Sequence, residues 1–144
     1  MKYTLCIEGD NGKINITDPD VIKEVRIKIY QSDKSANDRS DQLFGDLTIK
    51  GVLTDKSQQE TKELFEWSMK TDKSSVYKTV SIKVYNQEEL LRDYYLKEIY
   101  CTSYEEIFNE YADESGQESD SIGSFVLEMK QRKGAIGTIV VSNE

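Results

Sequence analysis

The sequence predicts a mainly β domain that contains one helix. Short runs with alternating apolar and polar residues recur along the chain, and clusters of Gly, Asp, Asn and Ser separate them. Only the segment after Thr54 has a convincing helical pattern. With 144 residues, the chain is long enough to bury a core without disulfides or metals. We therefore predict a single domain over residues 1–144, with seven strands and one helix.

Two strands are predicted before the first long polar segment. The first is Lys2–Glu8, and the Gly9–Gly12 cluster that follows has strong turn chemistry. The second is Val21–Gln31, which begins after the only proline. Its apolar face carries Val25, Ile27 and Ile29, and its polar face carries Arg26, Lys28 and Tyr30.

A polar loop and a third strand come next. The segment Ser32–Gln42 contains one apolar residue, so it has nothing to pack into a core and is predicted to be a surface loop. Leu47, Ile49 and Leu53 mark one face of the third strand, with Gly51 at a candidate bulge.

The helix is predicted to start at a Thr-Asp-Lys-Ser turn. Asp55 or Ser57 can cap it, and Ser57 with Glu60 matches the capping box. The helix is predicted to end near Thr71, and it should pack against or between sheets. Its apolar residues form one loose stripe: Leu64, Phe65, Trp67 and Met69.

The second half of the chain predicts four further strands. They are Tyr77–Tyr85, Tyr94–Tyr104, Ser124–Arg132 and Ala135–Ser142, the last two forming a hairpin. Tyr94–Tyr104 is apolar on both faces, which is typical of a strand covered by a helix or a neighbouring subunit. The acidic segment Asp113–Ser121 should be exposed.

Composition and charge exclude several classes of partner. The net charge of −8, from 19 basic and 27 acidic residues, argues against a phosphate backbone or an anionic membrane. No apolar run is long enough to span a bilayer, and the N-terminus lacks a signal-peptide pattern, so we expect folding in the cytoplasm. Cys6 and Cys101 are predicted to be buried thiols, with a disulfide as the less favoured alternative.

The sequence offers little catalytic chemistry. It has no histidine, which removes the usual general base and the imidazole metal ligand. The loops fail the calcium-loop pattern, and no glycine-rich phosphate motif is present. We therefore predict no catalytic residues, no cofactor and no metal.

One region resembles a known family. A long polar loop, then Asp46-Leu47-Thr48-Ile49-Lys50, then Thr54-Asp55-Lys56-Ser57 leading into a helix is similar to hemolysin-coregulated (Hcp) proteins and phage tail-tube proteins. Downstream, the order of strands is also similar, including the run Tyr100–Tyr104. The similarity in element order covers roughly Val21–Arg132.

This resemblance implies a fold and a mode of assembly. It implies two packed antiparallel sheets that form a β-barrel with one flanking α-helix. It also implies a subunit of hexameric rings, stacked into the inner tube of a type VI secretion-like, phage-tail-like or extracellular contractile injection system. Sheath, baseplate or spike proteins and cargo effectors would be partners, and the assembled particle would leave the cell. The residues expected at subunit contacts are Asp33, Lys34, Asn37, Asp38, Arg39, Arg26, Lys28, Tyr94, Tyr95 and Tyr100.

Two other classes of function stay open on the sequence. Nine tyrosines could line a small-ligand or carbohydrate site in a monomeric β-sandwich or barrel, because aromatic faces stack on ligands. The acidic charge could instead belong to an inhibitor or immunity protein with a basic partner.

Overall fold

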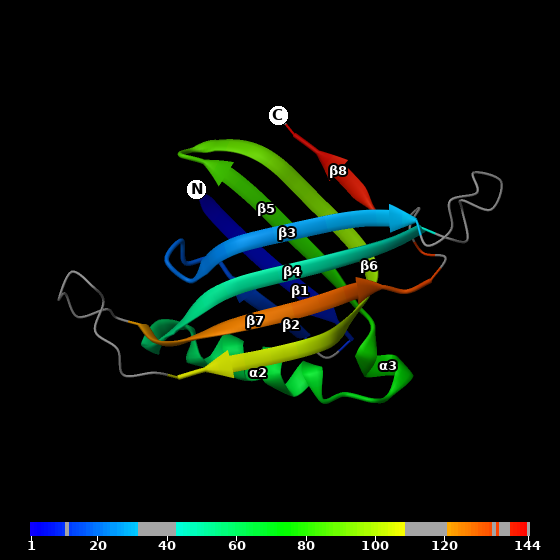
Figure 1. The fold of residues 1–144 in the computed structure, drawn as a ribbon, viewed down its shortest axis with the longest axis horizontal. Coiled ribbons are helices and arrows are strands. Elements are labelled where there is room, and N and C mark those ends of the chain that lie inside the picture. The colour runs from blue at the N-terminus through cyan, green and yellow to red at the C-terminus, as the bar shows by residue number, and fades with distance from the viewer. Residues whose placement is uncertain (11, 32–42, 109–120, 134, 136–138, 144) are drawn as a thin grey trace.

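The computed structural model describes residues 1–10, 12–31, 43–108, 121–133, 135 and 139–143. These residues form one antiparallel sheet of eight strands with helical segments beside it (Figure 1). The strands are β1 (Lys2–Gly9), β2 (Gly12–Ile16), β3 (Ile22–Gln31), β4 (Leu43–Thr54), β5 (Lys78–Asn86), β6 (Glu89–Ile107), β7 (Ser121–Gln131) and β8 (Val140–Ser142). The helical segments are η2 (Asp55–Ser57), α2 (Gln58–Ser68) and α3 (Lys73–Val76). The prediction of a mainly β chain with one substantial helix is confirmed.

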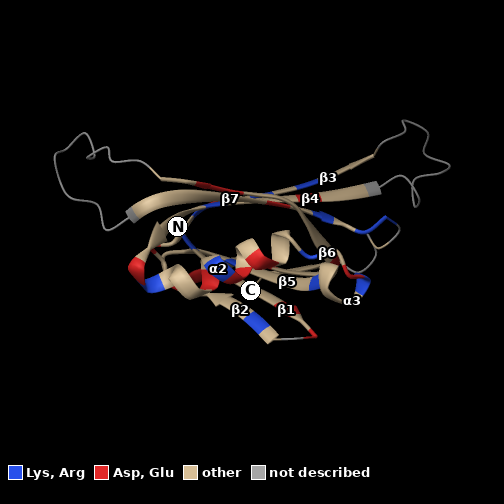
Figure 2. Ribbon diagram, turned by 90° about the horizontal axis from the view of Figure 1, so that it is seen from below, with Lys and Arg blue, Asp and Glu red and all other residues tan. Residues whose placement is uncertain are grey.

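The sheet folds back on itself into two layers. The strand order is β2-β1-β5-β6-β7-β4-β3, with β8 beside β6. We call β3, β4, β7 and the second half of β6 the front layer, and β1, β2, β5 and the first half of β6 the back layer (Figure 2). Within the described residues, the end strands β2 and β3 do not pair with each other. The predicted closed barrel is therefore wrong. Strand β6 joins the two layers on one side, and the other side stays open.

Strand β6 can serve both layers because it contains bulges. Glu98 has a positive φ of 58°, and the pairing register with β5 shifts beside it. The extra residue changes which side chains point inward, so Leu96 and Ile99 are both buried. The Arg132 backbone N–H donates to the Glu98 carbonyl at 2.9 Å, which holds this bend. The bulge explains why the predicted alternation along Tyr94–Tyr104 is unclear.

The core lies between the two layers. Along β1, β4, β5 and β7, buried residues that point inward alternate with less buried residues that point outward. This is the pattern of a strand with one buried face. The largest fully buried side chains include Leu5, Ile7, Leu47, Ile49, Leu64, Ile82, Leu96, Ile99, Phe125, Leu127 and Met129.

Helix α2 packs its Thr61, Leu64 and Trp67 side into this core. The Trp67 indole Nε1 donates to the Val76 carbonyl at 2.9 Å, which ties α3 to α2. The predicted capping box is wrong, because no side chain caps α2. The Ser57 hydroxyl is buried and lies 3.0 Å from the Thr54 hydroxyl instead.

Two sequence expectations about strands need correction. The sequence predicts no strand over Gly12–Ile16, but this segment forms β2 and pairs with β1 from Leu5↔Ile16 to Gly9↔Gly12. The expected hairpin of β7 with the C-terminal strand is also wrong. Both edges of β7 are already occupied by β4 and β6, so β8 pairs with β6.

Among the described helices, none combines the length and the apolar character needed to cross a bilayer.

Candidate interaction surfaces

The front layer ends in two backbone edges without a strand partner in the described part of the chain. Strand β3 pairs with β4 alone. Strand β6 pairs with β5 only as far as Ile99, so Tyr100–Ile107 pairs on its β7 side and leaves the other side open. Such edges present rows of N–H and C=O groups that can template another strand.

These two edges run in opposite directions. Strands β3, β4, β7 and β6 are each antiparallel to the next. Three reversals separate β3 from β6, so β6 runs opposite to β3. The two edges also lie on opposite sides of the molecule, β3 toward the top and the second half of β6 toward the bottom of Figure 1.

The outer face of the front layer carries charges of both signs. Glu24 lies 3.6 Å from Arg26 and 3.5 Å from Lys50, measured between side-chain oxygen and nitrogen. Lys130 lies 4.0 Å from Asp46, and that carboxylate is the main cause that raises the pKa of Lys130. Exposed pairs of this kind contribute little stability. This face therefore carries solvated charges of both signs.

The residues predicted at subunit contacts do not form one cluster. Arg26 and Lys28 are exposed on β3, on the outer face of the front layer. Tyr94 and Tyr95 lie on opposite faces of β6: Tyr94 packs against the core and Tyr95 is 41 % exposed. Tyr100 packs edge-on against another tyrosine. Asp33, Lys34, Asn37, Asp38 and Arg39 lie outside the described residues.

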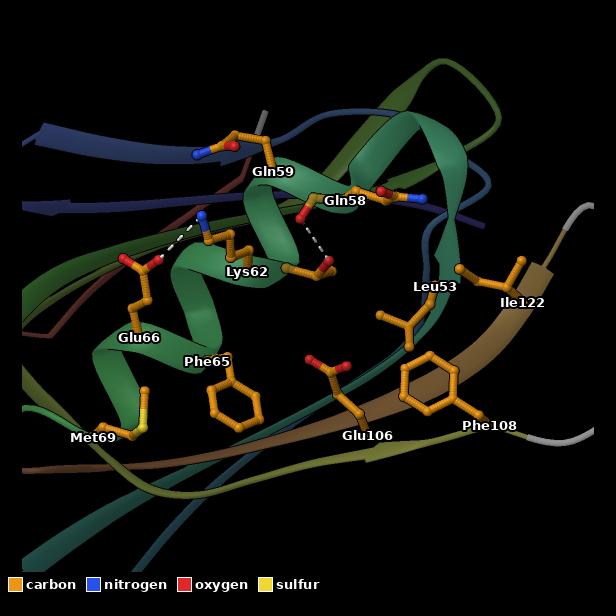
Figure 3. Close-up of a pocket in the computed structure, with 11 residues that line it drawn as sticks. Leu53, Gln58, Gln59, Lys62, Phe65, Glu66, Met69, Glu106, Phe108 and Ile122 are labelled. Carbon is orange, nitrogen blue, oxygen red and sulfur yellow. Dashed lines mark hydrogen bonds and ion pairs between the residues drawn. The ribbon is translucent and has the colours of Figure 1, made fainter.

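An apolar groove of about 680 Å³ runs between α2 and the neighbouring ends of β6 and β7 (Figure 3). Four large apolar side chains line it and are still accessible: Phe65 is 44 % exposed, Met69 61 %, Phe108 63 % and Ile122 45 %. The predicted single stripe on the helix is therefore wrong. Phe65 and Met69, four residues apart, form a second stripe on the outer face, which a helical projection of the sequence would have separated from Leu64 and Trp67.

Glu106 places a carboxylate in this groove, between Phe65 and Phe108 (Figure 3). The hydroxyl of the neighbouring Tyr104 donates to the Thr61 carbonyl at 3.4 Å and so links β6 to α2. Burial, and then the Glu106 charge, raise the pKa of Tyr104 far above its usual range. Tyr104 therefore stays a neutral donor at physiological pH.

A second concavity, of about 630 Å³, lies between β3 and the back layer. We call it the seam, because it separates the edge strand β3 from the back layer. Val25 and Ile27 of β3 face Tyr3, Val84 and Tyr94 of the back layer, and all five side chains are partly buried against the core. Arg26 and Arg92 also line the seam.

The two cysteines are free, as predicted, but both are half-buried and not buried as expected. Burial raises the pKa of the Cys101 thiol, which donates to the Ser103 carbonyl at 3.5 Å. A thiol with a raised pKa holds less thiolate, so Cys101 is poorly suited to act as a nucleophile.

No family model and no curated protein matches this sequence. Solved structures are similar to it over nearly the whole chain. Hcp1 from Flavobacterium johnsoniae has a TM-score of 0.61 at 16 % identity, covering 100 % of this chain and 97 % of that one. A second Hcp protein gives a TM-score of 0.63 at 15 % identity, covering 100 % and 99 %. A chain of the PVC sheath–tube complex, an extracellular contractile injection system, gives 0.53 at 12 % identity, covering 99 % and 89 %. The predicted resemblance is thus confirmed at the level of the fold.

Proposed function

We propose that this chain is a structural subunit, not an enzyme, that assembles into hexameric rings. The rings stack into the hollow inner tube of a contractile injection system of the type VI secretion, phage-tail or extracellular kind. The shared fold supports this proposal, since similar structures include Hcp proteins and a chain of a sheath–tube complex.

The observation that carries the proposal is the pair of open, oppositely directed edges on the front layer. When β3 of one copy lies beside the second half of β6 of the next, the strands are antiparallel and the sheet continues across the boundary. Repetition of this contact by rotation closes a ring and leaves no exposed edge in the front layer. Self-assembly therefore removes the feature that makes an isolated copy prone to uncontrolled pairing.

The charged face of the front layer gains a role in such a ring. The back layer and α2 lie on the opposite side of this layer, so they make each copy bulkier there (Figure 2). With the bulk outside, the face with Lys28 and Lys130 lines the channel, and Arg26 on the edge strand β3 lies at the junction between copies. Mixed charges keep the channel wet and without a strong preference for one sign of cargo.

The remaining partners follow from the same proposal. One similar chain comes from a sheath–tube complex and another from the baseplate of the anti-feeding prophage. We therefore include a sheath and a baseplate among the partners of this chain. It would be made in the cytoplasm and would leave the cell only within an assembled particle.

Light scattering and negative-stain electron microscopy of the full chain test the proposal. We expect ring-shaped particles whose mass is a multiple of 16.6 kDa and whose fraction grows with concentration. A chain that remains a 16.6 kDa monomer at every concentration would contradict the proposed function.

A further inference from the structure

The outer face of α2 and the end of β6 carry accessible apolar side chains along the groove beside α2. We call Phe65, Met69 and Phe108 the α2 strip; these side chains are between 44 % and 63 % exposed. Phe65 is held in place by an edge-on contact with Tyr104, at 5.8 Å between ring centroids. Exposed apolar side chains that cluster on a soluble protein often mark an interaction site.

The seam offers a recess of complementary character. Its walls are the inner face of β3 and the side chains of Tyr3, Val84, Leu91 and Tyr94 from the back layer. Of these, Val84 and Tyr94 are packed against the core yet remain partly accessible. A recess of about 630 Å³ is large enough to accept several side chains.

The two surfaces carry opposite charges. Glu66 and Glu106 lie beside the α2 strip, and the Glu66 carboxylate is 3.8 Å from the Lys62 ammonium in an exposed pair. Arg26 and Arg92 line the seam, and among the described residues the ion pair of Arg26 is with Glu24, at 3.6 Å and in an exposed position. Both existing pairs are weak in water and can be exchanged for contacts across an interface.

The two surfaces also lie on opposite sides of the molecule. The α2 strip is next to the second half of β6, and the seam is bounded by β3. In Figure 1, α2 lies at the bottom and β3 in the upper half. A rotation that brings β3 of one copy to β6 of the next therefore carries the seam toward the neighbour's α2 strip.

We infer that the α2 strip of one copy docks in the seam of the next copy, as the apolar half of the ring contact. This inference rests on the proposed function and adds to it: edge pairing sets the direction, and the docked side chains supply the buried apolar area. The contact is heterologous, because the strip and the seam are different surfaces of the same chain.

Disulfide trapping between two differently labelled copies tests this inference. Both natural cysteines are first replaced, as Cys6→Ala and Cys101→Ala, and this background must still assemble. One preparation then receives Met69→Cys and the other Leu91→Cys. We expect a cross-linked dimer under mild oxidation when the two preparations are mixed. Neither preparation alone should cross-link, because the strip of one copy contacts the seam of the next and neither surface contacts its own equivalent. As a control, Met69→Cys is mixed with Lys13→Cys, which is exposed on β2 at the other end of the sheet from β3, and no cross-link should form.

A second measurement avoids engineered thiols. Met69→Gln should raise the concentration needed for half assembly roughly tenfold, which corresponds to about 1.4 kcal/mol of lost apolar contact. Lys13→Gln, at an exposed position on β2, should leave it unchanged.

The possible failures of the two proposals are distinguishable. Rings that form normally, give no mixed cross-link and tolerate Met69→Gln would overturn the docking inference and leave the tube assignment standing. A wild-type chain that never assembles would overturn both.

Discussion

Gly51 shows how one residue links three parts of the front layer. It pairs with Ile22 on one side and with Phe125 on the other. The register with β3 shifts here, since Ile22 pairs with Gly51 and Glu24 with Lys50, which leaves Lys23 as the extra residue. The sequence indicated a bulge at Gly51, and the structure places the extra residue on the facing strand. A glycine in one strand can reflect a feature of its neighbour, and no pattern within β4 reveals this.

Substitution of Gly51 is expected to destabilise the fold. A Cβ at this position would lie 2.6 Å from the Phe125 ring and 2.6 Å from the Val21 carbonyl oxygen. Neither neighbour can move freely, because the ring is buried and the carbonyl accepts a bond from the Val52 N–H at 2.9 Å. We expect Gly51→Ala to lower the free energy of unfolding by about 1–3 kcal/mol in urea denaturation.

Gly45→Ala is the matched control. Its Cβ would lie no closer than 3.4 Å to a side-chain atom, which is ordinary contact, so a change within about 0.5 kcal/mol is expected. Equal stabilities of the two variants would show that the approach of Phe125 to Gly51 is not tight.

Among the elements, strands with one buried face were predictable and those that serve two environments were not. The alternation of Val25, Ile27 and Ile29 identified β3, because Val25 and Ile27 pack against the core, although Ile29 is 48 % exposed. The same reasoning failed for β6, because this strand crosses between the layers. Its bulge at Glu98 changes which alternate side chains point toward the core. The short strand β2 was missed because five residues with two buried isoleucines give too little pattern.

The free edge of β3 can be tested with proline. Successive residues of an antiparallel strand direct their N–H groups to opposite edges, so of Arg26 and Ile27 one faces β4 and the other faces outward. Proline at the inward position removes a ladder bond and should cost about 1–3 kcal/mol of stability. Proline at the outward position should preserve a cooperative melting transition and abolish rings.

Circular dichroism on Arg26→Pro and Ile27→Pro identifies which variant remains folded, and light scattering then reports its mass. A folded proline variant that still forms normal rings would show that the β3 edge takes no part in assembly.

For the whole molecule, the resemblance in the Asp46–Ser57 segment predicted the fold better than composition did. That segment includes the turn between β4 and α2, where the Thr54 and Ser57 hydroxyls lie 3.0 Å apart. Barrel closure was not predictable from it, because closure depends on whether strands distant in sequence meet. The predicted subunit contacts stay a prediction, with Arg26 and Lys28 exposed on the open strand β3. Phe65 and Met69 were expected to pack against the sheets together with Leu64 and Trp67, but both are exposed.

Net charge leads to a prediction about assembly as a function of salt. Each copy carries −8, so copies repel one another at low ionic strength. The Debye length falls from about 30 Å at 0.01 M to about 10 Å at 0.1 M, which screens this long-range repulsion. We expect sedimentation velocity to show more rings as salt rises over this range.

A double variant, Asp10→Asn with Glu88→Gln, removes two negative charges and should weaken the salt dependence. Rings that dissociate as salt rises would instead mean that short-range charge pairs between copies outweigh the net repulsion.

The four-stranded front layer also constrains how such a chain can evolve. An even count lets every junction between copies keep the alternating sense of its strands. A lineage that gained or lost a single strand in this layer would bring like-directed edges together at each boundary. Changes in ring diameter are therefore easier to reach by altering the number of subunits in the ring, or by inserting whole hairpins into this layer.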